Sequence, residues 1–169
     1  MVNSKKKLPI HRKVYIAPSK IEGYGIFAKQ DFKPGQTVYI IKGRIIKFNI
    51  RNERDALYGP LWIGIGKNTW IDTRGVAPYL NHSSNPNCGI RGRVTVCAMR
   101  PIKKGEEITI DYSITEEQPL WWMKDATAKN KKESIIRAIQ FMPKEKFKRY
   151  LPYIPRYFQS VYRKHHKLA

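Results

Sequence analysis

Asn81 and His82 stand in a polar stretch, residues 80–88, that follows a short apolar run. An asparagine side chain offers both an acceptor and donors, which suits it to the ammonium group of an amino acid. A lone Asn-His pair in a turn is more often structural than ligand-binding. The pair therefore needs support from other parts of the chain before it indicates a binding site.

A second polar group surrounds Tyr112, at the end of the strand-like run in residues 107–110. By itself this tyrosine would be a half-buried aromatic at a strand end. The acidic residues Glu106, Glu107 and Asp111 frame it, and we expect them to form ion pairs or turn hydrogen bonds. A tyrosine hydroxyl held in this way can orient a reacting group.

Two further stretches precede these, residues 21–28 and residues 71–79. The first contains Gly23-Tyr24-Gly25, whose glycines permit positive φ and let another group approach the backbone closely. A Gly-x-Gly step alone is as often an ordinary turn as a binding loop. In the second, we expect Asp72 and Arg74 to have mainly structural roles.

Taken in order, the four stretches resemble the SET-domain protein lysine methyltransferases, over about residues 14–112. The resemblance implies a mainly β fold of several small sheets, a pseudoknot-like active site and S-adenosylmethionine as cofactor. It implies that Asn81 holds the methionine end of the cofactor, that His82 contacts the adenine through its backbone, and that Tyr112 is the central catalytic residue. The full set of cofactor-binding residues that it implies is Gly23, Tyr24, Gly25, Tyr79, Asn81 and His82.

Methylation of lysine requires a neutral amine. With a lysine pKa near 10.4, removing the proton at pH 7 costs about 4 to 5 kcal/mol. A narrow, dry channel beside a positive sulfonium lowers that pKa, because desolvation and a like charge both disfavour ammonium. The reaction then needs a positioned tyrosine hydroxyl and carbonyl oxygens, and it needs no dedicated strong base.

The chain departs from the family at two channel positions. Many members carry a tyrosine just before the glycine that matches Gly43, where Ile41 and Lys42 stand here, and a further aromatic where Gly89-Ile90 stands. The aromatics that could substitute are Tyr39, Tyr58 and Trp62. These departures leave open the number of methyl groups transferred and the activity itself.

Many relatives also close the channel with a cysteine-rich, zinc-binding segment after the tyrosine that matches Tyr112. This chain has no cysteine after Cys97, and neither of its two cysteines has metal-ligand spacing, so we expect no metal site. Both cysteines are expected to be small buried hydrophobes. We expect Trp121, Trp122 and the helices beyond them to form the lid by hydrophobic packing.

Short runs rich in Val, Ile, Tyr and Trp predict the strands that hold these motifs. They cover residues 14–17, 26–28, 37–41, 45–48, 62–65, 70–72, 94–98 and 107–110. A brief helix is predicted at 51–57. After Tyr112, the stripe of Ile135, Ile136 and Ile139 predicts a helix over 131–142, and Pro143 and Pro155 predict the starts of two more. The predicted organisation is a basic arm at 1–13, a SET domain at 14–113 and a helical, basic C-terminal segment at 114–169 that packs on the SET domain.

Charge is the unusual feature of the composition. The chain has 33 Lys plus Arg against 13 Asp plus Glu, a formal net charge of +20. Such a surface attracts polyanions, so nucleic acid is an expected partner besides the lysine of a protein substrate. With no signal-peptide pattern and no membrane-spanning run, we expect a cytoplasmic protein, associated with a nucleoid or with chromatin. Two alternatives stay open: a nucleic-acid-binding protein that keeps the SET fold as a scaffold, and a basic protein whose tail forms an oligomer interface.

Overall fold

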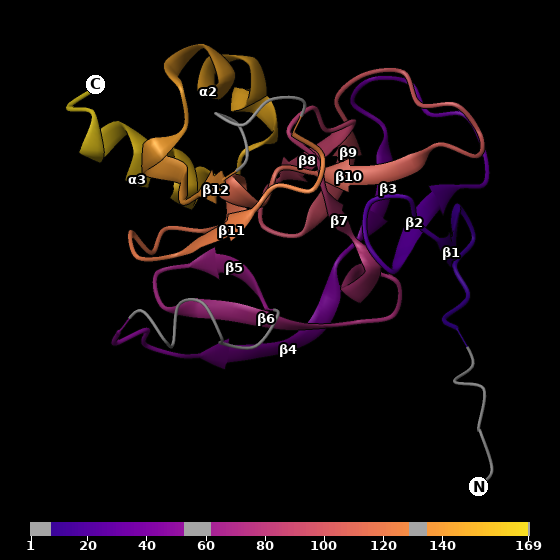
Figure 1. Cartoon of the computed structure of the whole chain (residues 1–169), viewed down its shortest axis with the longest axis horizontal. Coiled ribbons are helices and arrows are strands. Elements are labelled where there is room, and N and C mark those ends of the chain that lie inside the picture. The colour runs from indigo at the N-terminus through magenta and orange to yellow at the C-terminus, as the bar shows by residue number, and fades with distance from the viewer. Residues whose placement is uncertain (1–7, 53–61, 129–134, 169) are drawn as a thin grey trace, which may run out of the picture.

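The computed structural model describes residues 8–52, 62–128 and 135–168. Within these residues the fold is mainly β, with several small sheets and short helices near the C-terminus (Figure 1). The predicted fold class is confirmed. None of the helices in the described parts combines the length and apolar composition needed to cross a bilayer.

The sheet that carries the polar motifs joins segments far apart in sequence. Its order is β1-β2-β10-β7, with β1 at Val14–Pro18, β2 at Tyr24–Ala28, β10 at Glu107–Ile110 and β7 at Asn81–His82. β7 runs parallel to β10, which places Asn81 beside Thr109 and His82 beside Ile110. β10 is also antiparallel to β2. The Asn-His pair and the strand leading to Tyr112 are therefore neighbours, as a pseudoknot-like site requires.

Two three-stranded sheets support this one. The first has the order β3-β9-β8, with β3 at Thr37–Ile40, β9 at Thr95–Ala98 and β8 at Cys88–Arg91. The second has the order β4-β6-β5, with β4 at Lys42–Lys47, β6 at Thr69–Arg74 and β5 at Ile63–Gly66. All eight predicted strands correspond to strands of the structure. The helix predicted at 51–57 lies mostly outside the described residues.

The predicted helix over 131–142 is wrong over 135–142, and its first four residues lie outside the described residues. β11 at Trp122–Lys124 pairs with β12 at Ile135–Arg137, and a 3-10 helix, η4, follows at Ile139–Phe141. Ile135 is exposed while Ile136 is buried, which is the alternation of a strand and not the stripe of a helix. Cross-strand pairing, which a single segment cannot reveal, decides the conformation here.

The two later helices begin where the prolines predict. α2 covers Lys144–Tyr150 and α3 covers Arg156–His165, with Pro143 and Pro155 at the respective N-caps. Three further 3-10 helices lie in the described residues: η1 at Ala77–Tyr79, η2 at Tyr112–Thr115 and η5 at Leu151–Tyr153. The C-terminal segment thus combines a hairpin with short helices, and the expectation that it is mostly helical is only partly correct.

One hydrophobic core joins the C-terminal segment to the sheets. The core contains Ile26, Ile90 and Ile108 from the strands together with Phe158 and Tyr162 from α3, all at most 1% exposed. Burial of each such side chain stabilises the fold by about 1.5 to 3 kcal/mol. The aromatic tail therefore packs on the β domain, as the number of its aromatic residues predicts.

Candidate active site

Three acceptor oxygens converge on the side chain of Asn81. Asn81 Nδ2 lies 3.3 Å from Glu22 O, 3.2 Å from Tyr24 O and 2.8 Å from Glu107 Oε1. Its Oδ1 accepts no hydrogen bond from any residue in the described parts of the chain. We call these four residues the acceptor edge. Two backbone carbonyls, a carboxylate and an amide oxygen with free capacity form a surrounding that a bound ammonium group would satisfy.

The two glycines beside the acceptor edge are required for different physical reasons. Gly23 has φ +46°, a conformation that a side chain would strain. At Gly25, a Cβ atom would lie 2.1 Å from Glu107 Oε1 and 3.2 Å from Asn81 Nδ2. Only glycine leaves this cradle unfilled, so the Gly-Tyr-Gly loop lies directly against the acceptor edge.

Tyr24 and Tyr79 lie edge to face, with ring centroids 6.4 Å apart. Tyr24 is half exposed and β2, which carries it, contacts the 3-10 helix η1 that ends at Tyr79. The structure therefore brings the glycine loop, Tyr79 and Asn81 to one place.

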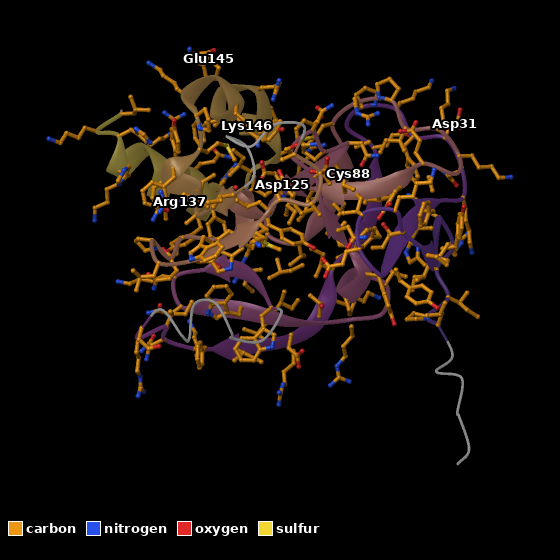
Figure 2. All side chains as sticks on the ribbon, viewed as in Figure 1. Asp31, Cys88, Asp125, Arg137, Glu145 and Lys146 are labelled. Atoms are coloured by element: carbon orange, nitrogen blue, oxygen red, sulfur yellow. The ribbon has the colours of Figure 1, made fainter. Side chains whose placement is uncertain are left out.

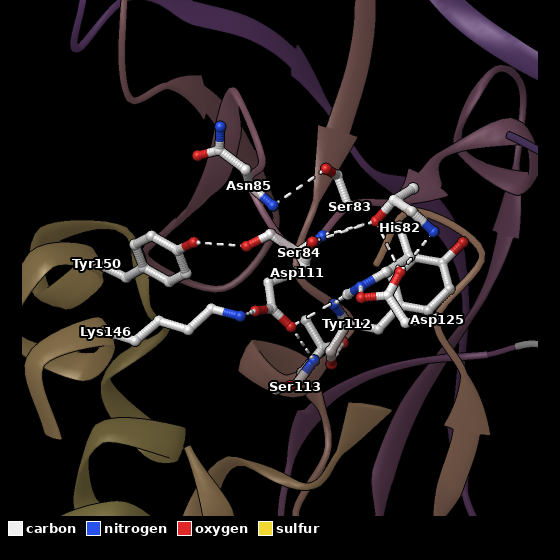
Figure 3. A network of polar contacts seen from close by, with 12 residues as sticks. His82, Ser83, Ser84, Asn85, Asp111, Tyr112, Ser113, Asp125, Lys146 and Tyr150 are labelled. Carbon is white, nitrogen blue, oxygen red and sulfur yellow. Dashed lines mark hydrogen bonds and ion pairs between the residues drawn. The ribbon is translucent and has the colours of Figure 1, made fainter. Parts of the chain in front are cut away.

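His82 is buried, and its ring lies beside Asp125 of the C-terminal segment (Figure 3). Its Nδ1 accepts a hydrogen bond from Tyr112 N at 3.2 Å, and its Nε2 lies 3.3 Å from Asp125 Oδ2. Burial lowers the pKa of His82, and the carboxylates of Asp111 and Asp125 only partly oppose that effect. The imidazole is therefore neutral at pH 7.

Tyr112 begins the 3-10 helix η2, directly after β10. Its hydroxyl donates a hydrogen bond to Leu80 O at 2.6 Å, the carbonyl immediately before Asn81. Burial, with smaller contributions from Glu22 and Glu107, raises the pKa of Tyr112 well above its usual value. The hydroxyl consequently keeps its proton, so it can act as a hydrogen-bonding group and not as a base at neutral pH.

The two positions where the resemblance led us to look for aromatics hold buried aliphatic side chains, Ile41 and Ile90. Tyr39 is also buried, and its hydroxyl has no hydrogen-bond partner among the described residues. Burial raises the pKa of Tyr39, with further contributions from Cys88 and Tyr112. Trp62 is half-buried, and Tyr58 lies outside the described residues.

Sequence reasoning missed a polar network on the other side of His82. It joins Asp125 and Thr127, from the loop after β11, to Ser84 and His82. Lys146 of α2 pairs with Asp111 at 2.6 Å. An Asp-x-Thr step is a recognisable turn signal, but nothing in it indicates a contact with residues some 40 positions earlier.

Of the lid expected from Trp121, Trp122 and the helices beyond them, the structure contradicts the part assigned to Trp122, while Trp121 is partly buried and α3 packs on the core. Trp122 is 39% exposed, and the segment that carries it reaches the site through polar side chains instead. Cys88 and Cys97 are buried and unpaired, as predicted, and burial raises the pKa of Cys88 far above its usual range. In the described residues, no group of histidine, cysteine or acidic side chains could hold a metal ion.

A family model described as "SET domain" matches residues 23–113. The chain is similar to histone-lysine N-methyltransferase 2D of Homo sapiens, with 34% identity over 119 residues, which cover 62% of this chain and 2% of that protein. It is also similar to histone-lysine N-methyltransferase trr of Drosophila melanogaster, with 30% identity over 128 residues, 67% of this chain and 5% of that protein. The chain thus spans only a small part of these relatives.

Among solved structures, the fold is similar to a chain of the Chaetomium thermophilum Polycomb Repressive Complex 2, in a humanized mutant bound to an inhibitor. The TM-score is 0.50 at 22% identity, over 63% of this chain and 15% of that one. At this identity the likeness concerns the fold alone.

Proposed function

The chain belongs to the SET-domain family, and we propose that it is a protein-lysine N-methyltransferase that uses S-adenosylmethionine. The observation that carries the proposal is the acceptor edge beside a buried tyrosine. Asn81, with its unused amide oxygen, lies one residue after the carbonyl to which Tyr112 donates. A ligand-binding group and a reaction-orienting group thus meet at one point of the fold.

Bound S-adenosylmethionine would supply an electrophilic methyl group on a positively charged sulfonium. The residues of the acceptor edge would hold its ammonium group: the Glu22 and Tyr24 carbonyls and the Glu107 carboxylate already surround the nitrogen of Asn81. Rotation of the Asn81 amide exchanges its oxygen and nitrogen without moving the backbone. The absence of a side chain at Gly25 keeps this place open.

Tyr112 would orient the lysine amine. Its hydroxyl is fixed by the bond to Leu80 O and still has acceptor capacity for an amine proton. The buried surroundings that raise the pKa of Tyr112 disfavour charge on a nearby lysine as well, and so favour its neutral form. Tyr39 would supply a second hydroxyl to the channel, in place of the aromatics that Ile41 and Ile90 replace, because its buried hydroxyl lacks a partner among the described residues.

The relatives named above are histone methyltransferases, so we propose a lysine of a basic, chromatin- or nucleic-acid-associated protein as the substrate. The substrate segment would add as an extended strand to a sheet edge, a common way for a peptide to bind. The test is transfer of labelled methyl from S-adenosylmethionine to purified histones and to a cell lysate, with Tyr112→Phe as the matched control. Methylation by the parent that the variant lacks supports the proposal. A parent that binds no S-adenosylmethionine in calorimetry refutes it.

A specific groove favours the second candidate function, binding of a polyanion. The groove has a volume of about 800 Å³ and lies beside β3 and β4. The cationic side chains that line it are Lys13, Lys42, Arg44 and Arg74, His11 lies beside them, and none of its described lining residues is acidic. Burial, followed by the charges of nearby lysines, lowers the pKa of His11. None of the acceptor-edge residues lines this groove, but Tyr39, the proposed second hydroxyl of the lysine channel, does, so a polyanion bound here would lie beside that channel.

Duplex DNA tests this second function. Replacing Lys42, Arg44 and Arg74 with Gln should reduce the slope of log affinity against log salt by about 0.9 for each phosphate that is no longer neutralised. A control that replaces three basic residues of α2 and α3 keeps the same net charge; it uses Lys144, Arg156 and Lys164. Equal slopes for the two triple variants would show that net charge alone, and not the groove, attracts DNA.

A further inference from the structure

A continuous series of polar contacts runs from the end of the Asn-His stretch into the C-terminal segment and back (Figure 3). Ser84 N donates to Thr127 Oγ1 at 2.9 Å, and Thr127 Oγ1 donates to Asp125 Oδ1 at 2.6 Å. Thr127 N also donates to Asp125 Oδ1, at 2.7 Å. The Asp125 side chain is 3% exposed. A turn at the surface would leave its carboxylate in water, so the burial requires another explanation.

The positions of the protons on His82 explain why the Asp125 carboxylate is buried. Because Tyr112 N donates to His82 Nδ1, that atom has no proton, and the neutral ring must carry its proton on Nε2. Nε2 is buried and lies 3.3 Å from Asp125 Oδ2. An N–H group therefore faces a carboxylate, although the two do not form a hydrogen bond; the other donors of the series, Ser84 N, Thr127 Oγ1 and Thr127 N, each have an acceptor. Although burial raises the pKa of Asp125, the hydrogen bonds from Thr127 and the interaction with His82 lower it by more.

A second connection comes from α2 and reaches the same place. Lys146 Nζ lies 2.6 Å from Asp111 Oδ2, and the Asp111 side chain is 1% exposed. Tyr150 OH donates weakly to Ser84 O, at 3.4 Å. The hairpin loop and α2 thus attach to the two strands that end at the candidate site, one at each side of His82.

We infer that Asp125 is a positioning residue, which holds the His82 ring and, with Thr127 and Ser84, fastens the C-terminal segment over β7 by polar contacts. We call these four residues the clasp. The inference rests on the proposed function, since it assigns the clasp to the same cofactor site. It also gives the chain a metal-free way to hold its lid, with the described residues offering no metal site.

The clasp needs Asp125 charged and His82 neutral. The other titratable groups that face His82 are Asp111 from the end of β10, Tyr112 from η2 and Lys146 from α2. Asp111 favours protonation of the ring and Lys146 disfavours it. Removal of Asp125 takes away one of the two carboxylates that raise the pKa of His82, so this pKa should fall further.

The experiment uses the full chain and compares Asp125→Ala and Thr127→Val with the parent. Glu145→Ala is the matched control, because Glu145 lies on α2 but points outward, away from the clasp (Figure 2). Three quantities are measured: amide hydrogen exchange of residues 122–128, the tautomer and titration of His82 by nitrogen-15 NMR, and S-adenosylmethionine affinity by calorimetry. A His82→Gln spectrum assigns the ring signals among the four histidines.

We expect Asp125→Ala to speed exchange in 122–128 at least tenfold, to lower the pKa of His82 and to weaken cofactor binding at least tenfold. Thr127→Val should have the same effects on exchange and affinity. Thr127→Ser keeps the hydroxyl, so its exchange rate and affinity should match those of the parent. Faster exchange with an unchanged His82 titration would identify a turn with only a structural role and would overturn the inference. So would unchanged exchange in both variants. If the parent binds no S-adenosylmethionine, the proposed function fails, and the exchange and NMR results still decide the clasp.

Discussion

The two sides of the candidate site, the acceptor edge and the clasp, differ in how fully their polar groups are paired. On the acceptor edge, oxygens outnumber the hydrogens available to them, and Asn81 keeps an unused amide oxygen. In the clasp, Ser84 N and Thr127 Oγ1 each donate to one acceptor, and His82 Nε2 lies 3.3 Å from the Asp125 carboxylate without a hydrogen bond. Unused acceptors near the surface can bind a ligand, whereas a satisfied buried network holds segments in place. The difference separates binding residues from positioning residues.

The largest effect is expected at Asn81. Asn81→Ala should abolish measurable S-adenosylmethionine binding in calorimetry and leave a folded protein, because the cofactor ammonium would lose a buried partner. Asn87 is the control within the same stretch: it bridges β10 by bonds to Glu107 O and Thr109 N, both backbone atoms. Asn87→Ala should instead lower the free energy of unfolding by about 1 to 3 kcal/mol. Unchanged affinity in Asn81→Ala would remove the acceptor edge from the binding role.

Tyr112→Phe should lower turnover by about two orders of magnitude or more, with cofactor affinity nearly unchanged, because only the hydroxyl is removed. Tyr39→Phe should have a smaller effect on turnover, and it should leave the protein at least as stable as the parent, since the hydroxyl it removes is buried without a partner among the described residues. Single-turnover kinetics measure both variants. Equal rates for Tyr112→Phe and the parent would contradict the assigned role of Tyr112.

Lys146→Met tests the second attachment of the C-terminal segment. It leaves the buried Asp111 carboxylate without its cation and should lower the free energy of unfolding by about 3 kcal/mol. The double variant with Asp111→Asn should recover part of that stability, since no buried charge is then left unpaired. Urea denaturation measures both. A decrease that is the same in the single and double variants would mean that the ion pair is not the cause.

The smallest effect is expected at Glu116, which lies beyond Tyr112 and accepts hydrogen bonds from Glu117 N and Gln118 N. Burial raises its pKa from the usual 4.5 to about 7. Between these two pH values the folded chain binds a proton that the unfolded chain does not, so stability falls as pH rises through that window. Glu116→Gln should therefore stabilise the protein at pH 8, by about 1 to 3 kcal/mol, and have little effect near pH 4.5. Melting temperatures at the two pH values measure the difference.

His82 contributes a pH dependence of the opposite sign. Its pKa is lowered in the folded chain, so its contribution to stability is present above about pH 6.5 and is lost as pH falls through the folded value. In the parent the opposite dependence of Glu116 offsets part of this decrease, so the decrease should be larger in Glu116→Gln. The clasp should therefore loosen below pH 6.5, while the acceptor edge, which contains no histidine, should not.

Local patterns in the sequence were enough to predict eight of the strands and the order of the motifs, but not the strands β7, β8, β11 and β12. Alternation of apolar residues, together with Gly and Pro steps, located the strands, because pleating and turn geometry act over a few residues. The same reasoning failed at Ile135 and Ile136, where a helical spacing and a strand spacing are both present and pairing with β11 decides between them. Two prolines located the starts of α2 and α3 because a proline lacks the N–H that an interior helical position would need.

The sequence by itself determined which residue types form the candidate site: an asparagine, a histidine and a tyrosine, at spacings that resemble one family. Only the tertiary structure decided what holds them. Asp125 reaches His82 across 43 positions of sequence and Lys146 reaches Asp111 across 35, both counted from their residue numbers. No local rule links such pairs, because their contact depends on how the hairpin and α2 pack on the sheets. Burial then removes water from the contact and gives those two carboxylates, which would be ordinary on a surface, their roles in the clasp and beside it.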